Sequence, residues 1–417
     1  MARLEGMLRL ALPILAFLTL QPAAFAKADK QPDPVILISF DGFRADYLDR
    51  GVTPNLSRLA AQGVTSPMRP SFPSKTFPNH WTLVTGLVPD HNGIVGNRFE
   101  DPRRPGVLFT MADDDPFWWN EGEPIWVAAE KAGIRSATMF WPGSNVAWGG
   151  TLPKPRAMPQ GGVRPQDWVQ YNQAVSDRQR VDTVIDWLRR PAASRPRLIT
   201  LYFDLVDTAG HENGPDDPKT MAAVAEADRR LGDLVEGIRK LGLHPNLIVV
   251  ADHGMAATSN ERVIPIDQLA DPKLYRVVES GPYAALEPTI GNAELLWAKL
   301  SLAGAHHKCW PRGQVPARLR YGSNPRTPSF LCLADPGWLL EPTTPPQSFS
   351  GGAHGYDPAA PEMAALFVAN GPAFIPGKRL LAFDNVDIAP LLRSLLDLPS
   401  APQADGTAVT FQGVIRQ

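Results

Sequence analysis

The sequence has little cysteine and, after its N-terminus, no long hydrophobic run. Its 417 residues include two cysteines, Cys309 and Cys332, and neither has a Cys-x-x-Cys or histidine context, which excludes a thiol redox motif and a cysteine nucleophile. No segment after the N-terminus reaches the roughly 18 apolar residues of a membrane-spanning helix. The chain also has no large excess of positive or negative charge, with 41 Lys+Arg against 43 Asp+Glu. This balance gives no support for a nucleic-acid-coating surface or a polybasic membrane contact.

The N-terminus has the pattern of an export signal. Arg3 and Arg9 precede an apolar run, Leu10–Leu20, which is too short for a stable membrane anchor. Ala24-Phe25-Ala26 then supplies a small-x-small cleavage site. We expect residues 1–26 to be a signal peptide and the mature protein to be periplasmic or secreted, without a membrane span. An uncleaved anchor is the alternative.

The two cysteines and the prolines point to a second structural unit. In an exported protein, a single pair such as Cys309 and Cys332 is expected to form a disulfide, and two buried thiols are the alternative. Proline is frequent, 43 of 417 residues, so much of the chain should be turns and loops. Residues 260–350 hold many prolines and both cysteines, which favours an inserted subdomain or cap.

Alternating strand and helix patterns predict the fold class. Five short apolar runs are typical of buried parallel strands: Val35–Phe40, Ser136–Phe140, Leu198–Phe203, Leu247–Ala251 and Ala364–Ala369. Helical patterns alternate with them, at Asn55–Gln62, Arg180–Arg190, Thr220–Leu241 and Asp387–Leu396. This order predicts an α/β domain over about residues 34–398, with a mostly parallel sheet flanked by helices. Residues 399–417 are then a C-terminal tail.

Chemically active side chains stand next to four of these strands. In open α/β sheets, ligands bind beyond the carboxyl ends of the strands. Three strands are followed by a carboxylate, and the fourth is preceded by a histidine. Six residues share this placement: Asp41, Asp207, His211, Asp252, His253 and His354.

Three carboxylates and three imidazoles form a ligand set for zinc and similar divalent ions. Six ligands are too many for one catalytic tetrahedron with an open position, but they suit two ions roughly 4 Å apart. A single pair carries little weight, because Asp252-His253-Gly254 alone is more often a cap or a turn. The convergence of four loops is what favours a two-metal site.

The segment from Ser71 to His80 supplies a candidate nucleophile. Thr76 precedes Pro78, which suits the first turn of a helix that runs to Gly86. A hydroxyl at a helix N-terminus lies in a positive field, and a bound cation would lower its pKa further. The alternative is that Thr76 only caps the helix.

Five motifs, in this order, resemble the nucleotide pyrophosphatase/phosphodiesterase family of the alkaline phosphatase superfamily. They are Ile38-Ser39-Phe40-Asp41-Gly42-Phe43-Arg44, Pro73-Ser74-Lys75-Thr76-Phe77-Pro78-Asn79-His80, Gly93-Ile94-Val95-Gly96-Asn97, Asp207-Thr208-Ala209-Gly210-His211 and Ala251-Asp252-His253-Gly254-Met255. The resemblance covers nearly the whole mature chain. It implies an alkaline-phosphatase-like core that binds two Zn²⁺ ions.

The resemblance also implies roles for single residues. One zinc would be held by Asp41, Thr76, Asp252 and His253, and the other by Asp207, His211 and His354. Asn97 would bind a phosphoryl oxygen, and Phe77 and Tyr202 would enclose a nucleobase. Thr76 would attack phosphorus and form a covalent nucleotidyl-threonine, so that a nucleoside triphosphate gives the monophosphate and pyrophosphate. The chain has Leu205-Val206-Asp207 where many animal members have Glu-Pro-Asp, but the ligand aspartate is kept.

Other functions remain as alternatives. A phosphomonoesterase of this superfamily would use a serine nucleophile with an arginine that binds the phosphate. This chain has Thr76 as the candidate nucleophile and the neutral Asn97 as the candidate phosphate contact. Arg44 or Lys75 could still reach a phosphate. A sulfatase motif fits the sequence less well. A metal-binding protein without catalytic activity would be expected to lack one or more of the six ligands, and none is missing. Among diesters, nucleotides are favoured, with choline-type lipid phosphodiesters as the alternative, because two aromatic rings can also enclose a quaternary ammonium group.

Overall fold

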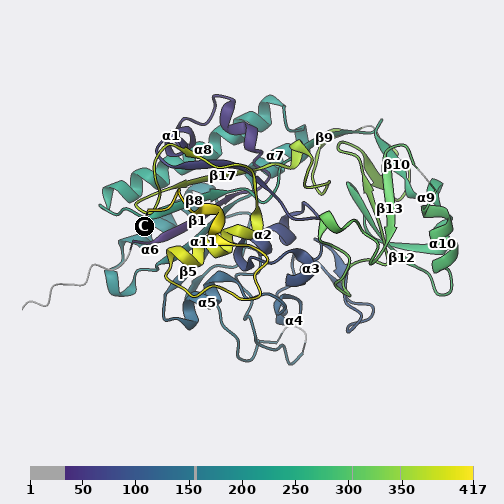
Figure 1. The fold of residues 1–417 in the computed structure, drawn as a ribbon, viewed down its shortest axis with the longest axis horizontal. Coiled ribbons are helices and arrows are strands. Elements are labelled where there is room, and N and C mark those ends of the chain that lie inside the picture. The colour runs from purple at the N-terminus through teal and green to yellow at the C-terminus, as the bar shows by residue number, and fades with distance from the viewer. Residues whose placement is uncertain (1–32, 155–156, 303, 348, 417) are drawn as a thin grey trace, which may run out of the picture. The chain divides into compact units, whose positions relative to one another are not determined.

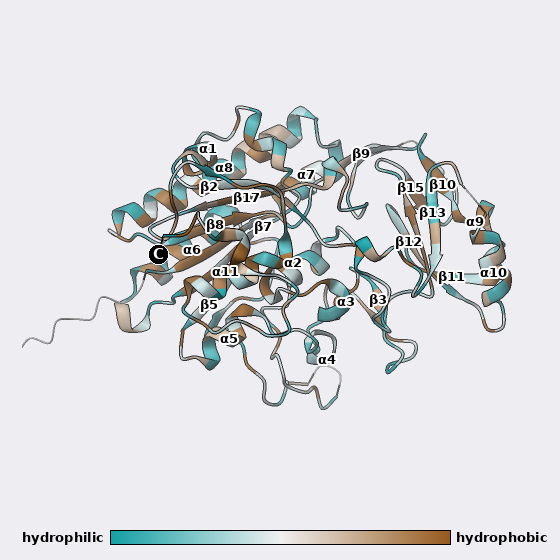
Figure 2. Cartoon of the chain, in the orientation of Figure 1, coloured by the Kyte–Doolittle hydropathy of each residue, from teal (hydrophilic) through white to brown (hydrophobic). Residues whose placement is uncertain are grey.

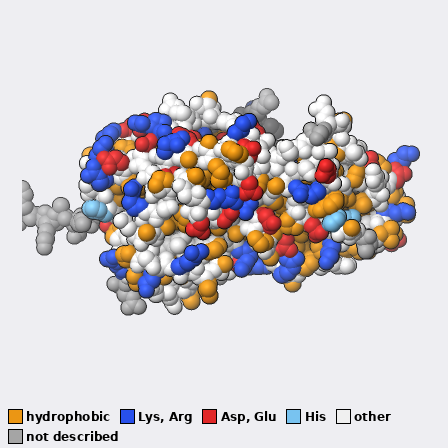
Figure 3. All heavy atoms as spheres, turned by 90° about the horizontal axis from the view of Figure 1, so that it is seen from above, with side chains coloured by type: hydrophobic (Ala, Val, Ile, Leu, Met, Phe, Trp, Pro, Cys, Tyr) orange, Lys and Arg blue, Asp and Glu red, His pale blue; other side chains and the backbone are white. Residues whose placement is uncertain are grey.

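A computed structural model describes residues 33–154, 157–302, 304–347 and 349–416 of the chain. The expected signal peptide, residues 1–26, lies outside the described residues. Within them, no helix is both long and apolar enough to cross a membrane. Acidic and basic side chains lie interspersed on the face shown in Figure 3.

The described residues form a central sheet of nine strands, which confirms the predicted α/β class. Eight strands follow in the order β18-β2-β17-β8-β1-β7-β5-β6, and β19 pairs with β2. Their bounds are β1 Val35–Phe40, β2 Val64–Arg69, β5 Ser136–Met139, β6 Asp167–Trp168, β7 Leu198–Phe203, β8 Asn246–Val250, β17 Ala365–Asn370, β18 Lys378–Arg379 and β19 Phe383–Asp384. The run β8-β1-β7-β5-β6 is parallel throughout.

One of the five predicted parallel strands runs the other way. β17 is antiparallel to both of its neighbours, β8 and β2. The expectation of a parallel strand was wrong here, because a continuous apolar run shows that a strand is buried but not which way it runs. As a result, the start of β17 lies at the edge where the parallel strands end, and a residue that precedes β17 can reach that edge.

The strands are central because both of their faces are apolar. All six residues of β1 and all six of β7 are buried, as burial on both sides requires. In Figure 2 the inner strands are among the most hydrophobic parts of the ribbon.

Two groups of helices cover the sheet, as the sequence predicts (Figure 1). One group packs together around the longest helix: α1 Pro54–Ala61, α6 Asp177–Arg189, α7 Leu205–Asn213 and α8 Pro218–Lys240. The other group contains α2 Thr76–Thr85, α3 Pro89–Asn92, α5 Ile125–Lys131 and α11 Ile388–Leu395. Local sequence sets several ends, for example the capping box at Ser176 and the left-handed Gly86 after α2.

The segment between β8 and β17 carries sheets of its own. β11 Tyr275–Glu279, β12 Tyr283–Pro288, β14 Phe330–Ala334 and β13 His307–Pro311 form an antiparallel sheet in this order. Cys309 and Cys332 stand opposite each other on β13 and β14 and form the predicted disulfide. A second group of buried side chains, including Leu286, Leu296 and Tyr356, gives this region its own core. The fold thus includes the disulfide-bearing insertion that the sequence indicates.

A buried arginine links the insertion to the α/β core. The Arg326 side chain is fully buried and donates to Asp101 Oδ2 at 2.7 Å and to the carbonyl oxygens of Gly93, Phe117 and Trp118. The C-terminal residues also pack on the core, because the buried Phe411 ring contacts Phe367 and Phe383.

Candidate active site

Four connections bring the six predicted ligands to one edge of the sheet. Asp41 follows β1, and Asp252 and His253 come shortly after β8. Asp207 and His211 lie one turn apart on α7, which follows β7. His354 follows β16 (Ser350–Ala353), which pairs with β9 (Ala256–Ser259) just after His253.

The first group of ligands surrounds Nε2 of His253. Asp252 Oδ2 lies 2.9 Å from this nitrogen, and Asp41 Oδ1 lies 3.4 Å from it. The Thr76 hydroxyl oxygen is 3.3 Å from the same nitrogen. The two carboxylates and the imidazole are buried. The group therefore has the membership expected for the first zinc site.

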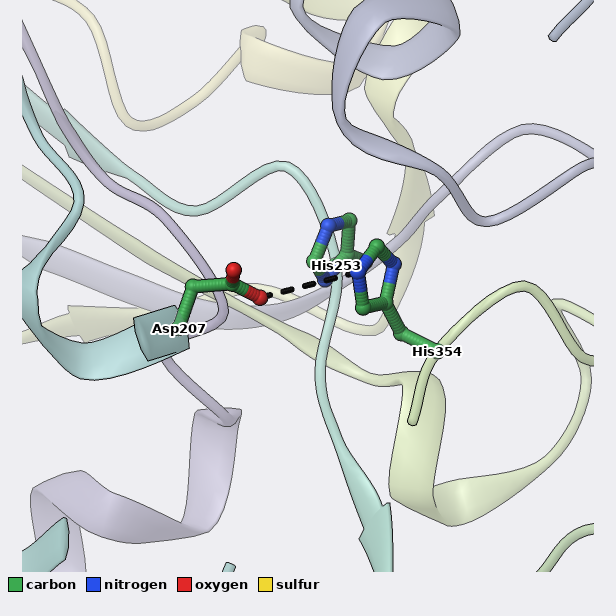
Figure 4. Close-up of side chains that lie close together, drawn as sticks. All are labelled: Asp207, His253 and His354. Atoms are coloured by element: carbon green, nitrogen blue, oxygen red, sulfur yellow. Dashed lines mark ion pairs between the residues drawn. The ribbon is translucent and has the colours of Figure 1, made fainter. Parts of the chain in front are cut away.

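The second group surrounds Asp207. Its Oδ1 lies 3.5 Å from Nε2 of His211 and 3.6 Å from Nε2 of His354. The two imidazole Nε2 atoms are 3.1 Å apart. Figure 4 shows Asp207 facing His354, with His253 alongside. The rings of His253 and His354 stack at 3.5 Å, so the two groups are adjacent.

Backbone carbonyls fix the tautomer of all three histidines. Each Nδ1–H donates to a carbonyl oxygen: His211 to Gly352 (2.8 Å), His253 to Gly254 (2.9 Å) and His354 to Ser74 (2.9 Å). In the neutral ring, the other nitrogen, Nε2, then carries a lone pair and no proton. Each of the three Nε2 atoms lies within 3.6 Å of a carboxylate oxygen, and those of His211 and His354 lie 3.1 Å apart. Metal-binding histidines adopt this arrangement, with the other ring nitrogen donating to a carbonyl oxygen.

Three carboxylate oxygens in the same place have no hydrogen-bond donor within the described residues. They are Asp41 Oδ1, Asp207 Oδ1 and Asp252 Oδ2. Burial raises the pKa of Asp41 well above its usual value, and the nearby carboxylates of Asp252 and Asp207 raise it further. Buried acceptors without donors are costly unless a cation lies among them. The donor set fits divalent cations. Two triads that share His253, Asp41-Asp252-His253 and Asp207-His253-His354, each have their ligand atoms within 4.8 Å of one another.

Thr76 is not the cap of helix α2. The N-cap residue is Lys75, whose side chain makes no capping hydrogen bond, and Thr76 is the first helical residue. Its hydroxyl faces His253 instead. Below it, the buried His80 contacts the Thr76 carbonyl oxygen through Nδ1 (2.9 Å) and the Ser39 hydroxyl through Nε2 (2.8 Å).

Asn97 lies beside the first turn of α2. Its Oδ1 accepts a hydrogen bond from the Phe77 backbone N–H at 3.0 Å. This contact orients the amide and leaves the Nδ2 hydrogens to a ligand. Asn97 and Thr76 line the same cavity, so a neutral donor is available to a ligand bound there.

A cavity of about 690 Å³ opens over these residues. Thr76, Asn97 and the second ligand group line one end of it. Aromatic and amide side chains line the rest, including Phe77, Trp119, Trp141, Asn145, Tyr171 and Gln173. A cavity of this size with an apolar wall and a few polar groups is typical of a small-molecule site.

Tyr202 lines the cavity next to Asp41. Its side chain is buried, with 8% exposed, and its hydroxyl donates to Asp41 Oδ2 at 2.7 Å. The exposed aromatic side chain of the cavity is Tyr171, which is 45% exposed and which the sequence analysis did not single out. Tyr171 follows the two-residue strand β6 in a polar stretch, so no periodicity marked it.

The two basic residues considered for a phosphate differ in placement. Arg44 pairs with Asp46 at 2.8 Å and does not line the cavity. Lys75 does line the cavity, next to Thr76, and burial lowers the pKa of its ammonium group. A guanidinium from Arg44 is therefore not in position to bind a dianionic phosphate in this cavity.

The family model of type I phosphodiesterases/nucleotide pyrophosphatases matches residues 35–357, more than three quarters of the chain. The chain belongs to this family. A pyrophosphatase/phosphodiesterase of Schizosaccharomyces pombe is 38% identical and covers 91% of this chain and 79% of its own length. A bis(5'-adenosyl)-triphosphatase of Xenopus laevis is 37% identical, covering 88% and 78%.

Solved structures agree with this membership. Human ectonucleotide pyrophosphatase/phosphodiesterase 5 superposes with a TM-score of 0.86 at 33% identity, over 92% of this chain and 100% of the other. The murine protein, as an inactive threonine-to-alanine variant in complex with AMP, gives a TM-score of 0.85 at 32% identity with the same coverage. These neighbours establish the alkaline-phosphatase-like fold. The chain is an enzyme of the nucleotide pyrophosphatase/phosphodiesterase family, a phosphoric diester hydrolase.

Proposed function

We propose that this enzyme hydrolyses nucleotide phosphodiester and pyrophosphate bonds with two zinc ions and a covalent nucleotidyl-threonine intermediate. The observation that carries the proposal is the convergence of three histidine lone pairs and three carboxylate oxygens beside the Thr76 hydroxyl. Asp41, Asp252, His253 and Thr76 would hold one ion, and Asp207, His211 and His354 the other. When bound, the ions supply positive charge for phosphoryl oxygens and favour ionisation of Thr76.

The chain's own groups then account for the reaction. The Thr76 oxygen attacks the α-phosphorus of the nucleotide, its proton passes to solvent, and the bond from phosphorus to the bridging oxygen breaks. Pyrophosphate leaves, and the nucleoside phosphate remains esterified to Thr76. The Asn97 amide donates to a non-bridging oxygen as charge develops there. A water molecule then attacks phosphorus, the Thr76 ester bond breaks, and Thr76 recovers a proton.

A nucleotide is favoured because of the cavity wall. Phe77 and the exposed Tyr171 both present aromatic surface to the cavity that begins at Thr76. Aromatic rings stack on any nucleobase, with about 1–3 kcal/mol per base. The AMP held by the murine relative and the bis(5'-adenosyl)-triphosphatase name of the amphibian relative support the same class of substrate.

Two other substrate classes stay as alternatives. A choline-type lipid diester would use the same aromatic side chains as a cage for its quaternary ammonium group. A phosphomonoester would need a further cationic group near the phosphate. Of the two candidates, Arg44 and Lys75, only Lys75 lines the cavity.

We propose that the protein acts in the periplasm or outside the cell, on the basis of the export signal predicted in residues 1–26.

Product analysis tests the proposal. The zinc-loaded mature protein is incubated with ATP, and the products are separated by chromatography. We expect AMP and pyrophosphate, which arise from attack at the α-phosphorus. ADP and phosphate would instead indicate the monoesterase. If ATP is untouched while a phosphocholine diester is cleaved, the nucleotide assignment is wrong.

A further inference from the structure

The Tyr202 hydroxyl donates a hydrogen bond to one oxygen of a predicted metal ligand. It donates to Asp41 Oδ2 at 2.7 Å in a fully buried setting. The other oxygen, Asp41 Oδ1, has no hydrogen-bond donor within the described part of the chain and faces Nε2 of His253 at 3.4 Å. The two oxygens of Asp41 thus have different partners.

We propose that Tyr202 is a positioning residue, whose hydroxyl fixes the orientation of Asp41 and so sets the affinity of the first metal site. This rests on the two-cation site of the proposed function. A free carboxylate can rotate, or bind a cation through both oxygens. A hydrogen bond to Oδ2 leaves Oδ1 as the available ligand atom and directs it toward His253 and Asp252.

The surroundings of Tyr202 hold its hydroxyl in place. Tyr202 lies on β7 opposite Ser39 of β1, two residues before Asp41. Its ring packs edge-on against His80 at 5.2 Å and Tyr171 at 6.0 Å. Its carbonyl oxygen accepts from the buried Arg180 at 3.0 Å. The hydroxyl is therefore held in place before any cation binds.

The neighbouring tyrosine offers a matched control. The Tyr171 hydroxyl donates to Asp204 Oδ2 at 3.2 Å, and Asp204 is not one of the predicted ligands. Tyr202→Phe and Tyr171→Phe therefore remove the same atom from two adjoining rings. Only the first loss concerns a predicted metal ligand.

The experiment measures zinc affinity of the full mature protein by competition with a chromophoric chelator. Loss of such a supporting hydrogen bond typically weakens metal binding 10- to 100-fold. We expect Y202F to weaken one of the two zinc-binding steps by about this factor, and Y171F to leave both steps within about twofold of wild type. With excess zinc, Y202F should recover much of its kcat, whereas a purely structural defect would not respond to zinc.

A double variant tests whether the hydroxyl acts through Asp41. In an Asp41→Asn background, adding Y202F should change zinc affinity little. Equal zinc affinity in Y202F and wild type overturns the proposal, as does an undiminished Y202F effect in the D41N background. A Y202F chain that stays unfolded at saturating zinc also contradicts it, because the hydroxyl is then structural. Failure of the wild type to bind zinc would instead contradict the proposed function.

Discussion

The Nε2 atoms of His211 and His354 lie 3.1 Å apart, while Nδ1 of each ring donates to a backbone carbonyl oxygen. Two lone pairs at this distance repel each other unless a positive charge lies between or beside them. Asp207 Oδ1, at 3.5 and 3.6 Å from these nitrogens, adds a third acceptor. The backbone contacts that fix the rings therefore shape the site that we propose for the second cation.

Metal removal should reduce both activity and stability. Without cations, the buried acceptors of Asp41, Asp207 and Asp252 lose their compensation. We expect a chelator to abolish turnover, zinc to restore it, and elemental analysis to give two zinc ions per chain. Zinc at 1,000 times its Kd should stabilise the fold by about 4 kcal/mol for each ion bound, seen as a rise in Tm. A Tm that does not respond to zinc would argue against the site.

Thr76→Ala should abolish the chemical step and spare zinc binding. We expect kcat to fall on the order of 10³-fold or more, because the nucleophile is lost. Thr76→Ser keeps a hydroxyl and should retain part of the activity. Thr85→Ala, at the other end of α2, is the matched control and should stay near wild-type kcat. Wild-type turnover by T76A would remove Thr76 from the mechanism.

Two substitutions of Asn97 separate its two contacts. Asn97→Asp keeps an oxygen to accept from the Phe77 N–H but has no Nδ2 donor and adds a negative charge. Both N97D and Asn97→Ala should lower kcat roughly 10²- to 10³-fold, the usual effect of losing one oxyanion donor. If N97D retained full activity, the backbone contact alone would explain the role of Asn97. Steady-state rates with an activated diester make the comparison.

Tyr171→Ala should impair nucleotides more than small diesters. Loss of a stacking ring costs about 1–3 kcal/mol, so KM for ATP should rise roughly 5- to 150-fold. Methyl p-nitrophenyl phosphate has no base, and its kcat/KM should change little. Trp168→Ala, an exposed aromatic residue that does not line the cavity, serves as the control. An equal loss with both substrates would argue against base stacking.

The Arg326–Asp101 pair should anchor the insertion to the core. Arg326→Met leaves the buried Asp101 short of a partner and should cost about 3–5 kcal/mol of unfolding free energy. Arg312 is an exposed arginine of the same insertion. Arg312→Met should lower the unfolding free energy by less than about 1 kcal/mol. Denaturant unfolding of both variants makes the comparison, and equal stabilities would show that the buried pair is not an anchor.

The Arg326–Asp101 pair should also make the free energy of unfolding depend on pH. Burial alone would raise the pKa of Asp101, but hydrogen bonds from Arg103 and Arg326 outweigh burial and hold this pKa below its ordinary value. The stabilisation is then complete above the ordinary carboxyl pKa of about 3.9 and is lost as the pH falls toward the folded value. We expect unfolding free energy to drop below about pH 4 in the wild type, and to drop less in R326M. Parallel pH profiles would contradict this assignment.

The strands and the placement of the candidate ligands were predictable because short-range patterns encode them. Buried strands show as apolar runs, and Asp41 and Asp252 follow β1 and β8 closely. Strand direction was not predictable, since an apolar run indicates burial but not direction, and β17 pairs antiparallel with β8. Helix α7 was also missed, because Leu205–Asn213 combines ligands and glycine without a helical apolar stripe.

The aromatic residues show where sequence alone is insufficient. Tyr202 and Tyr171 are both tyrosines near predicted strands, yet one is buried against Asp41 and the other is exposed in the cavity. The difference depends on Arg180 and Asp204, which hold the end of β7 and the Tyr171 hydroxyl. Such contacts join residues that are distant in the chain and leave no local pattern.

Trapping of the covalent intermediate tests the central claim most directly. The zinc-loaded enzyme is mixed with ATP, quenched in acid within milliseconds, and digested for peptide mass spectrometry. We predict an adenylyl group on Thr76, and no adduct in Thr76→Ala. Turnover of ATP to AMP without any adduct on Thr76, together with an active T76A enzyme, would contradict the account.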